Sequence, residues 1–182
     1  MNQTADLTEK TLSREEKYQG NILSLHVDQV QLPNGKTSFR EVVEHVGGVA
    51  ILALDDRNNV LTVTQYRYVF GRPLLEIPAG KLEPGEDPVS GALRELKEET
   101  GAVPDTFLPM GVVLPSPGCL GERLHLFLAR GLHMEKQHLD EDEFLNVERI
   151  PFSEMVHRVM DGEIEDGKTI AAVLKAKVLL DL

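Results

Sequence analysis

Glu95, Glu98 and Glu99 place three carboxylates within five consecutive residues. If the segment is helical, Glu95 and Glu99 are neighbours on its surface and repel by roughly a few tenths of a kcal/mol. They also lie near the end of the segment, where the helix dipole disfavours negative charge. A divalent cation bound between them removes both costs, and carboxylate oxygens favour Mg²⁺ or Mn²⁺. Arg94 precedes Glu98 by four residues, so it can pair with Glu98 and hold that carboxylate.

Glutamate-rich helix faces are commonly just solvated, so the surrounding sequence must decide between a metal site and an acidic surface. Local signals predict a helix over residues 88–100. Asp87 suits the N-cap, Pro88 suits the first helical position, and Gly101 suits the C-terminal stop. Apolar residues at helical spacing predict a buried face on the side away from the glutamates: Val89, Ala92, Leu93 and Leu96.

The rest of the pattern contains more strands than helices. Apolar runs bounded by turn residues predict strands at 22–32, 37–45, 49–54, 60–66, 74–77, 107–114, 123–129 and 144–150. Two helices follow, one over 168–179 and one that begins at Ser153 as N-cap and buries Met155, Val156, Val159 and Met160. Because the helices do not alternate with the strands, we expect a mixed α+β layered domain.

The chain is expected to have two parts that meet near Gly47 and Gly48. Residues 1–45 would form an N-terminal extension and a small sheet, built on a hairpin around Pro33-Asn34-Gly35. Residues 46–182 would form the main domain. Residues 1–16 are polar, and we expect them to be frayed or to form at most a short helical turn.

Composition excludes several classes of partner. The net charge of -11 argues against nucleic acid or an acidic membrane surface as the main partner. No apolar run is long enough to span a bilayer, the N-terminus does not resemble a secretory signal, and one cysteine allows no internal disulfide. A cytoplasmic location is the resulting expectation. An acidic site can still bind a small phosphorylated substrate through cations.

The string around the glutamates resembles the Nudix hydrolase motif. That motif reads Gly, five residues, Glu, seven residues, Arg-Glu, an aliphatic residue, any residue, Glu-Glu, any residue, Gly and an aliphatic residue. The matching positions are Gly80, Glu86, Arg94, Glu95, Leu96, Glu98, Glu99 and Gly101, and the one departure is the small Ala102. The resemblance implies an α/β/α sandwich with a mixed sheet and hydrolysis of a nucleoside diphosphate linked to another group.

The resemblance also implies roles for these residues. Glu95 and Glu99 look like the main metal ligands, and Glu98 looks like a further ligand or an orienter of water. Arg94 would position the carboxylates, and Glu86 would brace the loop before the helix. The chemistry fits, because a pyrophosphate is anionic and metal ions neutralise it and acidify the attacking water.

The flanking residues are similar to the ADP-ribose pyrophosphatase branch of the family. The similarity lies in Gln65-Tyr66-Arg67, in 75–80, in Ser116-Pro117-Gly118 followed by Glu122, and in 32–35 with Arg40-Glu41. It implies a homodimer in which the N-terminal sheet is exchanged between subunits. It further implies a set of substrate-binding residues and one backbone metal ligand: Arg40, Arg67, Glu76 and Glu122 for the substrate, and the carbonyl of Ala79 for the metal.

The acidic run 140–143 would supply a general base or another metal contact in that branch. Glu143 is the first choice, with Glu141 or Asp142 in reserve. Cys119 is expected to pack rather than react, and no histidine pair has metal-ligand spacing.

The expected reaction is hydrolysis of ADP-ribose to AMP and ribose 5-phosphate. A second reading within the family is another nucleoside diphosphate sugar, such as GDP-mannose. A third reading, from another class, is a Nudix module that senses a nucleotide without cleaving it, although such modules usually lose motif glutamates. In each case the partner is a small nucleotide, with no nucleic acid and no membrane.

Overall fold

The computed structural model describes residues 5–139, residue 141 and residues 143–181. The chain forms two compact units. The first, called the N-terminal unit, comprises Met1–Val46 and Ser116–Glu122, and the second, called the main unit, comprises Gly47–Pro115 and Arg123–Leu182.

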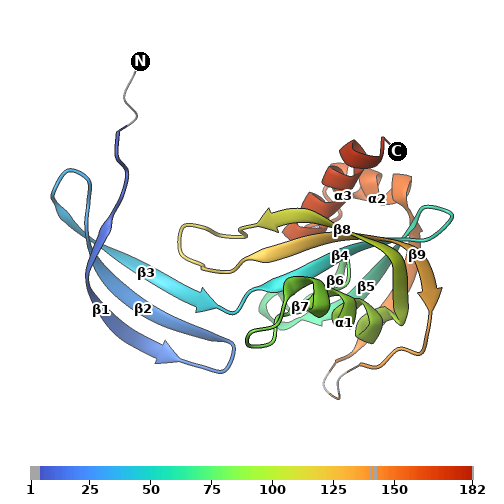
Figure 1. Cartoon of the computed structure of the whole chain (residues 1–182), viewed down its shortest axis with the longest axis horizontal. Coiled ribbons are helices and arrows are strands. Elements are labelled where there is room, and N and C mark those ends of the chain that lie inside the picture. Colours follow the sequence, from blue (N-terminus) through green and yellow to red (C-terminus); the bar gives the residue numbers. More distant parts are fainter. Residues whose placement is uncertain (1–4, 140, 142, 182) are drawn as a thin grey trace. The chain divides into compact units, whose positions relative to one another are not determined.

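The N-terminal unit is built on a three-stranded antiparallel sheet (Figure 1). Its strands, in spatial order, are β1 (Lys10–Gln19), β2 (Leu23–Gln31) and β3 (Thr37–His45). The hairpin between β2 and β3 turns where predicted, and the Gly35 amide donates to the Leu32 carbonyl at 2.9 Å.

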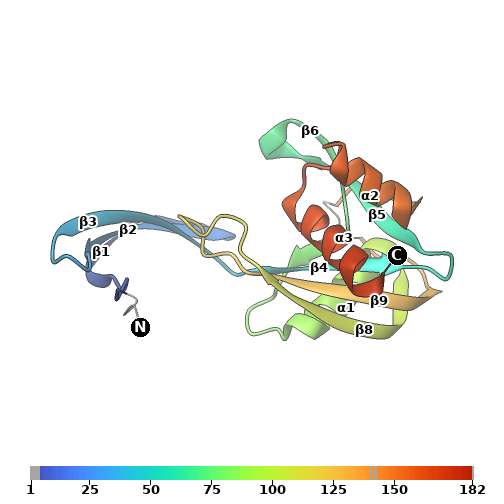
Figure 2. The ribbon, with the colours of Figure 1, turned by 90° about the horizontal axis from the view of Figure 1, so that it is seen from above.

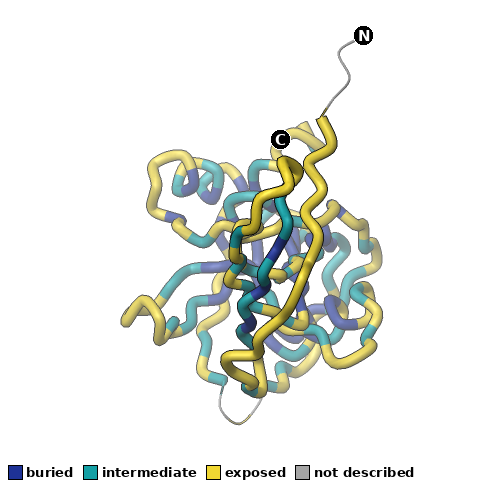
Figure 3. The backbone as a smooth tube through the Cα atoms, turned by 90° about the vertical axis from the view of Figure 1, so that its left-hand side faces the viewer, coloured by how far each residue is buried: buried dark blue, intermediate teal, exposed yellow. Residues whose placement is uncertain are grey.

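The expectation of a frayed N-terminus is wrong from Lys10 onward, because β1 pairs with β2 along its whole length. Every residue of β1 is exposed, which Figure 3 shows as a continuous exposed tube. A strand that is wet on both faces has no apolar alternation to read in its sequence. Backbone pairing with β2, rather than burial, therefore creates this strand.

The segment 116–122 belongs to the N-terminal unit because its backbone pairs with β3. The Val43 amide donates to the Cys119 carbonyl, and the Gly121 amide donates to the Val43 carbonyl, both at 2.8 Å. Cys119 is exposed, so the expectation that its side chain packs is wrong. The hydrogen bonds of this turn, and not its thiol, attach it to the sheet.

The main unit contains a mixed sheet whose central strand is predicted correctly. Every residue of β4 (Gly48–Leu54) is buried, as its continuous apolar run indicates. It pairs in parallel with β9 (Leu124–Met134), and the remaining pairs are antiparallel. The principal strand order is β10-β5-β4-β9-β8, with β6 beside β5 and β7 beside β4. The other strands are β5 (Asn59–Arg67), β6 (Arg72–Glu76), β7 (Ala79–Lys81), β8 (Ala102–Val113) and β10 (Leu145–Pro151).

Helices cover both faces of this sheet (Figure 2). On one face α1 (Pro88–Thr100) packs Ala92 and Leu96 against Val49, Ile51 and Phe127. On the other face α2 (Phe152–Met160) and α3 (Gly167–Leu180) pack Met155 and Val173 against the opposite side of β4. The main unit is therefore the expected α/β/α sandwich with a mixed sheet.

Several details of the main unit differ from the predictions. The strand β8 begins at Ala102 rather than at residue 107, and β7 is a short strand that its three residues do not signal. Ser153 is not the N-cap of α2, because the helix begins at Phe152 with no side-chain cap, and Met160 is exposed rather than buried. Among the described residues, no helix is long and apolar enough to cross a membrane.

Candidate active site

The helix that carries the glutamates has the predicted ends. Asp87 caps α1 by accepting hydrogen bonds from the amides of Val89 and Ser90, both at 3.1 Å. Gly101 ends the helix in the left-handed conformation, with φ 73°, and its amide donates to the Lys97 carbonyl at 2.8 Å. A side chain at φ near 73° is strained, which explains glycine at this position.

Of the four residues predicted to form the buried face of α1, two, Ala92 and Leu96, are buried. Val89 and Leu93 are exposed to 44% and 36%, whereas Glu95 and Glu99 are exposed to only 8% and 2%. Two acidic side chains thus occupy positions where an amphipathic helix would place apolar ones. Burial of carboxylates that are not both balanced by cations costs stability, so these positions point to a function.

Arg94 connects the carboxylates of this region. Its Nε and Nη2 each bind one oxygen of Glu86 at 3.0 Å, and its Nη1 binds both Glu95 and Glu98 at 2.9 Å. Nη2 also donates to the Lys81 carbonyl at 3.2 Å. The hydrogen bonds from Arg94 lower the pKa of Glu86 to about 2, so Glu86 is ionised at neutral pH. The predicted pair of Arg94 and Glu98 is confirmed, and one guanidinium holds three acids.

Glu99 is the most deeply buried of the three helix glutamates. Its Oε2 accepts a hydrogen bond from the Ala79 amide at 2.9 Å. Burial raises the pKa of Glu99 to about 8, and the nearby charges of Glu95 and Glu143 add to the rise. Burial likewise raises the pKa of Glu95, against the opposing effect of Arg94. These two side chains would become stable anions if a cation were bound beside them.

Gly80 is needed because Glu95 lies directly against it. A Cβ at this position would lie 2.0 Å from the carboxyl carbon of Glu95 and 2.1 and 2.2 Å from its oxygens. No larger residue fits without displacing the carboxylate. The first glycine of the motif therefore makes room for one of its glutamates.

The acidic loop lies partly outside the described residues. Asp140 and Asp142 lie outside the described residues, and Asp142 is one of the two reserve candidates for the base. Glu143 is partly buried, and its charge raises the pKa of both Glu95 and Glu99. Glu141, the other reserve candidate, is exposed. Of the described loop acids, Glu143 is the one with an electrostatic effect on both buried glutamates.

The donor chemistry of the site fits a hard divalent cation. Glu95 and Glu99 are oxygen donors, and burial raises the pKa of both, so a bound cation would favour their ionised forms. As they are placed, the described acidic, histidine and cysteine side chains do not converge in a group of three. Glu95 and Glu98 are instead turned towards Arg94, so a bound ion would compete with that guanidinium for their oxygens.

Arg67 and Glu76, two predicted substrate contacts, bind each other. The Nε and Nη2 of Arg67 contact the two carboxylate oxygens of Glu76 at 2.7 and 2.6 Å. Glu76 is 1% exposed and also pairs with Lys168. Burial alone would raise the pKa of Glu76, but hydrogen bonds and charge from Arg67 and Lys168 outweigh it and lower that pKa. Glu76 thus holds two cationic side chains, those of Arg67 and Lys168. Of the predicted pair, Arg67 retains an exposed surface and Glu76 does not.

Lys168 is absent from the predicted site residues. It lies in the first turn of α3, with its ammonium against Glu76 and against Asp166 at 2.9 Å. A signal for it exists in the sequence, because the helix dipole disfavours a lysine in the first turn of a helix. Its acidic partner Glu76 is too distant in sequence to be read from the same signal.

Two other predicted substrate residues lie in the N-terminal unit. Arg40 pairs with Glu9 and donates from Nη1 to the Phe39 carbonyl at 2.8 Å. Glu122 lies 3.5 Å from the Nδ1 of His45. Both belong to a different unit from the buried glutamates.

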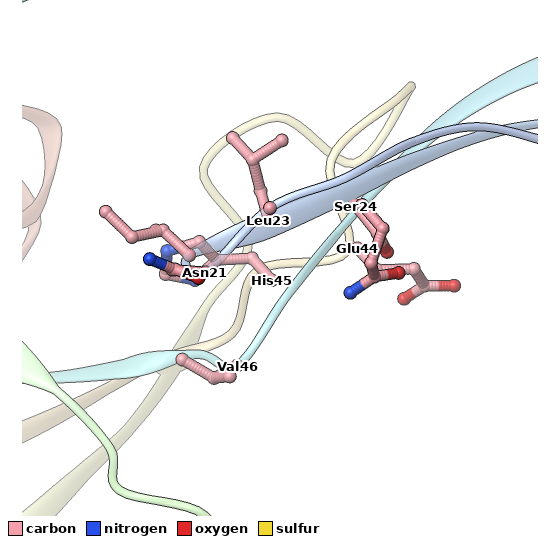
Figure 4. Close-up of a pocket in the computed structure, with 9 residues that line it drawn as sticks. Asn21, Leu23, Ser24, Glu44, His45 and Val46 are labelled. Carbon is pink, nitrogen blue, oxygen red and sulfur yellow. The ribbon is translucent and has the colours of Figure 1, made fainter.

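The N-terminal unit also has a hollow of about 260 Å³ beside the β1–β2 turn (Figure 4). Residues 19–24 and 44–46 line it, and Figure 4 shows Leu23, Ser24, Glu44 and Val46 among them. None of the predicted site residues lies in this lining.

Comparison with known proteins identifies the family to which the carboxylate helix belongs. The model of the NUDIX domain matches residues 44–173, most of the chain, and that of the nucleoside diphosphate sugar hydrolase N-terminal domain matches residues 9–43. The chain belongs to the Nudix family. It is a Nudix hydrolase, an enzyme that depends on a divalent metal. The two matches together account for both units of the structure.

Several curated proteins resemble this Nudix hydrolase over nearly its whole length. An ADP-ribose pyrophosphatase of Bacillus subtilis is 43% identical over 92% of this chain and 91% of its own. One of Mycobacterium tuberculosis is 41% identical over 91% and 81%. A methanol dehydrogenase activator of Bacillus methanolicus is 42% identical over 91% and 90%, and a GDP-mannose pyrophosphatase of Yersinia enterocolitica is 32% identical over 96% and 93%.

A solved structure shares the fold of this Nudix hydrolase. It is described as an ADP compounds hydrolase, and it superimposes with a TM-score of 0.86 over 98% of this chain and 97% of its own. The sequence identity is 21%, so this likeness concerns the fold alone.

Proposed function

We propose that this Nudix hydrolase cleaves the diphosphate of ADP-ribose and releases AMP and ribose 5-phosphate. The observation that carries the proposal is the likeness to proteins named ADP-ribose pyrophosphatase, at 41% and 43% identity, across both units. The intact carboxylate helix supports it, because every glutamate of the motif is present. The match of residues 9–43 to a nucleoside diphosphate sugar hydrolase domain supports the substrate class.

Mg²⁺ is the proposed cofactor, with Mn²⁺ as a substitute. Glu95 and Glu99 would hold the ion, with Glu98 and the carbonyl of Ala79 as further ligands. When bound, the ion neutralises the diphosphate and lowers the pKa of the attacking water. The glutamates' hard oxygens and the raised pKa values of Glu95 and Glu99 support this choice of metal.

The chain's own side chains have three further proposed tasks. Arg94 holds Glu95 and Glu98 in place through its hydrogen bonds at 2.9 Å. Glu143 accepts the proton of the attacking water, with Glu141 or Asp142 in reserve. Arg67 contacts the substrate phosphates or terminal ribose from a position fixed by Glu76.

Arg40 and Glu122 are proposed substrate contacts supplied through a homodimer. Both lie in the N-terminal unit, whose sheet has an exposed strand, β1, available to a second copy of the chain. A cytoplasmic location stays a prediction from composition.

Two alternatives have distinct signatures. A relative named GDP-mannose pyrophosphatase covers 96% of the chain at lower identity, 32%, so GDP-mannose is the second substrate to test. A module that only senses nucleotides would bind ADP-ribose without turnover. The complete set of motif glutamates in this protein argues against a role limited to sensing.

The experiment is a hydrolysis panel with Mg²⁺ that compares ADP-ribose, GDP-mannose, NADH and a dinucleoside polyphosphate. Glu99→Gln tests the site, and Thr62→Val, a buried change on β5, is the control. AMP from ADP-ribose, lost in Glu99→Gln and kept in Thr62→Val, supports the proposal. Much faster turnover of GDP-mannose overturns the substrate, and ADP-ribose binding without product overturns the activity.

A further inference from the structure

The start of α3 holds the segment Glu76–Ala79, which leads into β7. The Oγ1 of Thr169 accepts a hydrogen bond from the Ile77 amide at 2.9 Å. The preceding residue, Lys168, pairs with the preceding residue of the segment, Glu76. Two consecutive residues of the helix thus bind two consecutive residues of the segment.

The hydroxyl of Thr169 is oriented for this contact. Thr169 is fully buried, and its hydroxyl donates to the Oδ2 of Asp166, the N-cap residue of α3. The same carboxylate oxygen accepts from the Thr169 amide at 3.0 Å. Because the hydroxyl proton is committed to Asp166, the lone pairs of Oγ1 are left to accept the Ile77 amide.

The same segment also contacts Glu99. The Pro78 carbonyl accepts from the Ile51 amide at 2.9 Å, and the Ala79 amide donates to Glu99 at 2.9 Å. Each residue of such a segment has only two soft dihedral angles, so the positions of Ile77 and Pro78 largely determine where the Ala79 amide points. Without its hydrogen bond to Thr169, the buried Ile77 amide would have to find another partner or move.

We propose that Thr169 is a positioning residue for the metal site, because it fixes Ile77 and through it the amide that holds Glu99. The inference rests on the proposed function only in taking Glu99 as a metal ligand. Thr169 touches neither metal nor substrate and acts through three residues of backbone. A residue that merely caps α3 would affect folding stability and leave metal affinity unchanged.

The test measures Mn²⁺ binding without substrate, by the loss of the free-ion electron paramagnetic resonance signal on titration. Thr169→Val keeps the shape and removes the acceptor, and Thr169→Ser restores it. Thr62→Val is the matched control, because Thr62 is also fully buried and, among the described residues, its hydroxyl donates only to the Glu148 carbonyl, at 3.4 Å. Thermal unfolding of each variant records the loss of stability separately.

We expect Thr169→Val to weaken Mn²⁺ binding by about 10-fold or more, the range seen when outer-shell partners of metal ligands are removed. Thr169→Ser should stay within about 3-fold of the wild type, and so should Thr62→Val even if its melting temperature falls equally. Folded Thr169→Val with wild-type Mn²⁺ affinity overturns the proposal. If that variant does not fold, Thr169→Ala, which adds no methyl group beside the Ile77 amide, is judged by the same criterion.

Failure of the proposed function gives a different result. If the wild type does not hydrolyse ADP-ribose but Mn²⁺ binding follows the Thr169 pattern, the positioning role stands and the substrate is wrong. If ADP-ribose is hydrolysed and Thr169→Val binds Mn²⁺ normally, the substrate stands and the positioning role is wrong.

Discussion

The carboxylate of Glu95 lies so close to Gly80 that a single methyl group at the glycine would overlap it, 2.0 Å from the carboxyl carbon. Gly80→Ala should therefore displace Glu95 and reduce activity by at least about 10-fold, as when the support of a metal ligand is lost. Kinetic assays over a range of Mg²⁺ concentrations measure this, and more Mg²⁺ should be needed for half-maximal rate.

Gly162→Ala is the control for that substitution. Gly162 has φ 78° and, in the described part of the chain, no atom within 4 Å of an added Cβ, so alanine strains the backbone without meeting a neighbour. It should lower stability and leave the Mg²⁺ requirement alone. An equal change in the Mg²⁺ requirement in both variants would mean that Gly80 acts only through stability.

The buried carboxyl of Glu99 should make metal-free stability depend on pH. Its pKa is raised from 4.5 to about 8 in the folded protein, so between these values the unfolded chain releases the proton and the folded chain keeps it. The free energy of unfolding should fall as the pH rises through this window, by on the order of 5 kcal/mol at most. Denaturant unfolding with EDTA at pH 5 and pH 8 measures it.

Glu99→Gln provides the comparison, because glutamine does not titrate. The variant should show a much smaller fall between pH 5 and pH 8 and should be the more stable protein at pH 8 without metal. Parallel pH dependence in the two proteins would mean that a group other than Glu99 causes the fall. Added Mg²⁺ should stabilise the wild type at pH 8 and have little effect on the variant.

Arg94 should not tolerate lysine. A lysine cannot reproduce the two parallel contacts to Glu86 together with those to Glu95 and Glu98. We expect Arg94→Lys to lower kcat by about 10- to 100-fold. Arg158→Lys, at a half-exposed pair with Glu154 on α2, should change kcat by less than about 2-fold. Similar losses in both variants would show that guanidinium geometry at Arg94 is unimportant.

The loop acids can be separated by substitution. Glu143→Gln should lower kcat more than Glu141→Gln, because Glu143 is the described loop acid whose charge raises the pKa of both buried glutamates. Steady-state kinetics with saturating ADP-ribose and Mg²⁺ measure kcat for both variants. A larger loss in Glu141→Gln than in Glu143→Gln would transfer the role to Glu141.

Local signals predict the ends of α1 correctly, and its buried face only in part: Ala92 and Leu96 are buried as predicted, and Val89 and Leu93 are not. Asp87 and Gly101 act within one turn of the helix, so their roles follow from neighbouring residues. The buried face depends on what the sheet and the segment at Gly80 present to the helix. Apolarity favours Val89 and Leu93, but the site requires the carboxylates of Glu95 and Glu99 inside.

Contacts between distant segments are beyond the reach of sequence patterns for a related reason. The flanking similarity to the ADP-ribose pyrophosphatase branch locates Glu76 and Arg67, yet nothing near them indicates that Lys168 neutralises Glu76 from α3. The strand β1 escapes prediction because its residues are exposed on both faces and depend on β2 for their conformation. Sequence patterns indicate turns and continuous buried strands, but they do not indicate which distant residue or strand a segment contacts.

The attachment of the segment Glu76–Ala79 to α3 also determines when the site can form during synthesis. Lys168 and Thr169 follow their partners by 92 residues, so a ribosome completes the carboxylate helix long before it makes these anchors. The nascent chain then carries its glutamates with the adjoining segment still unanchored. Ribosomes that stall before α3 would release chains with the full signature motif and an incompletely assembled centre.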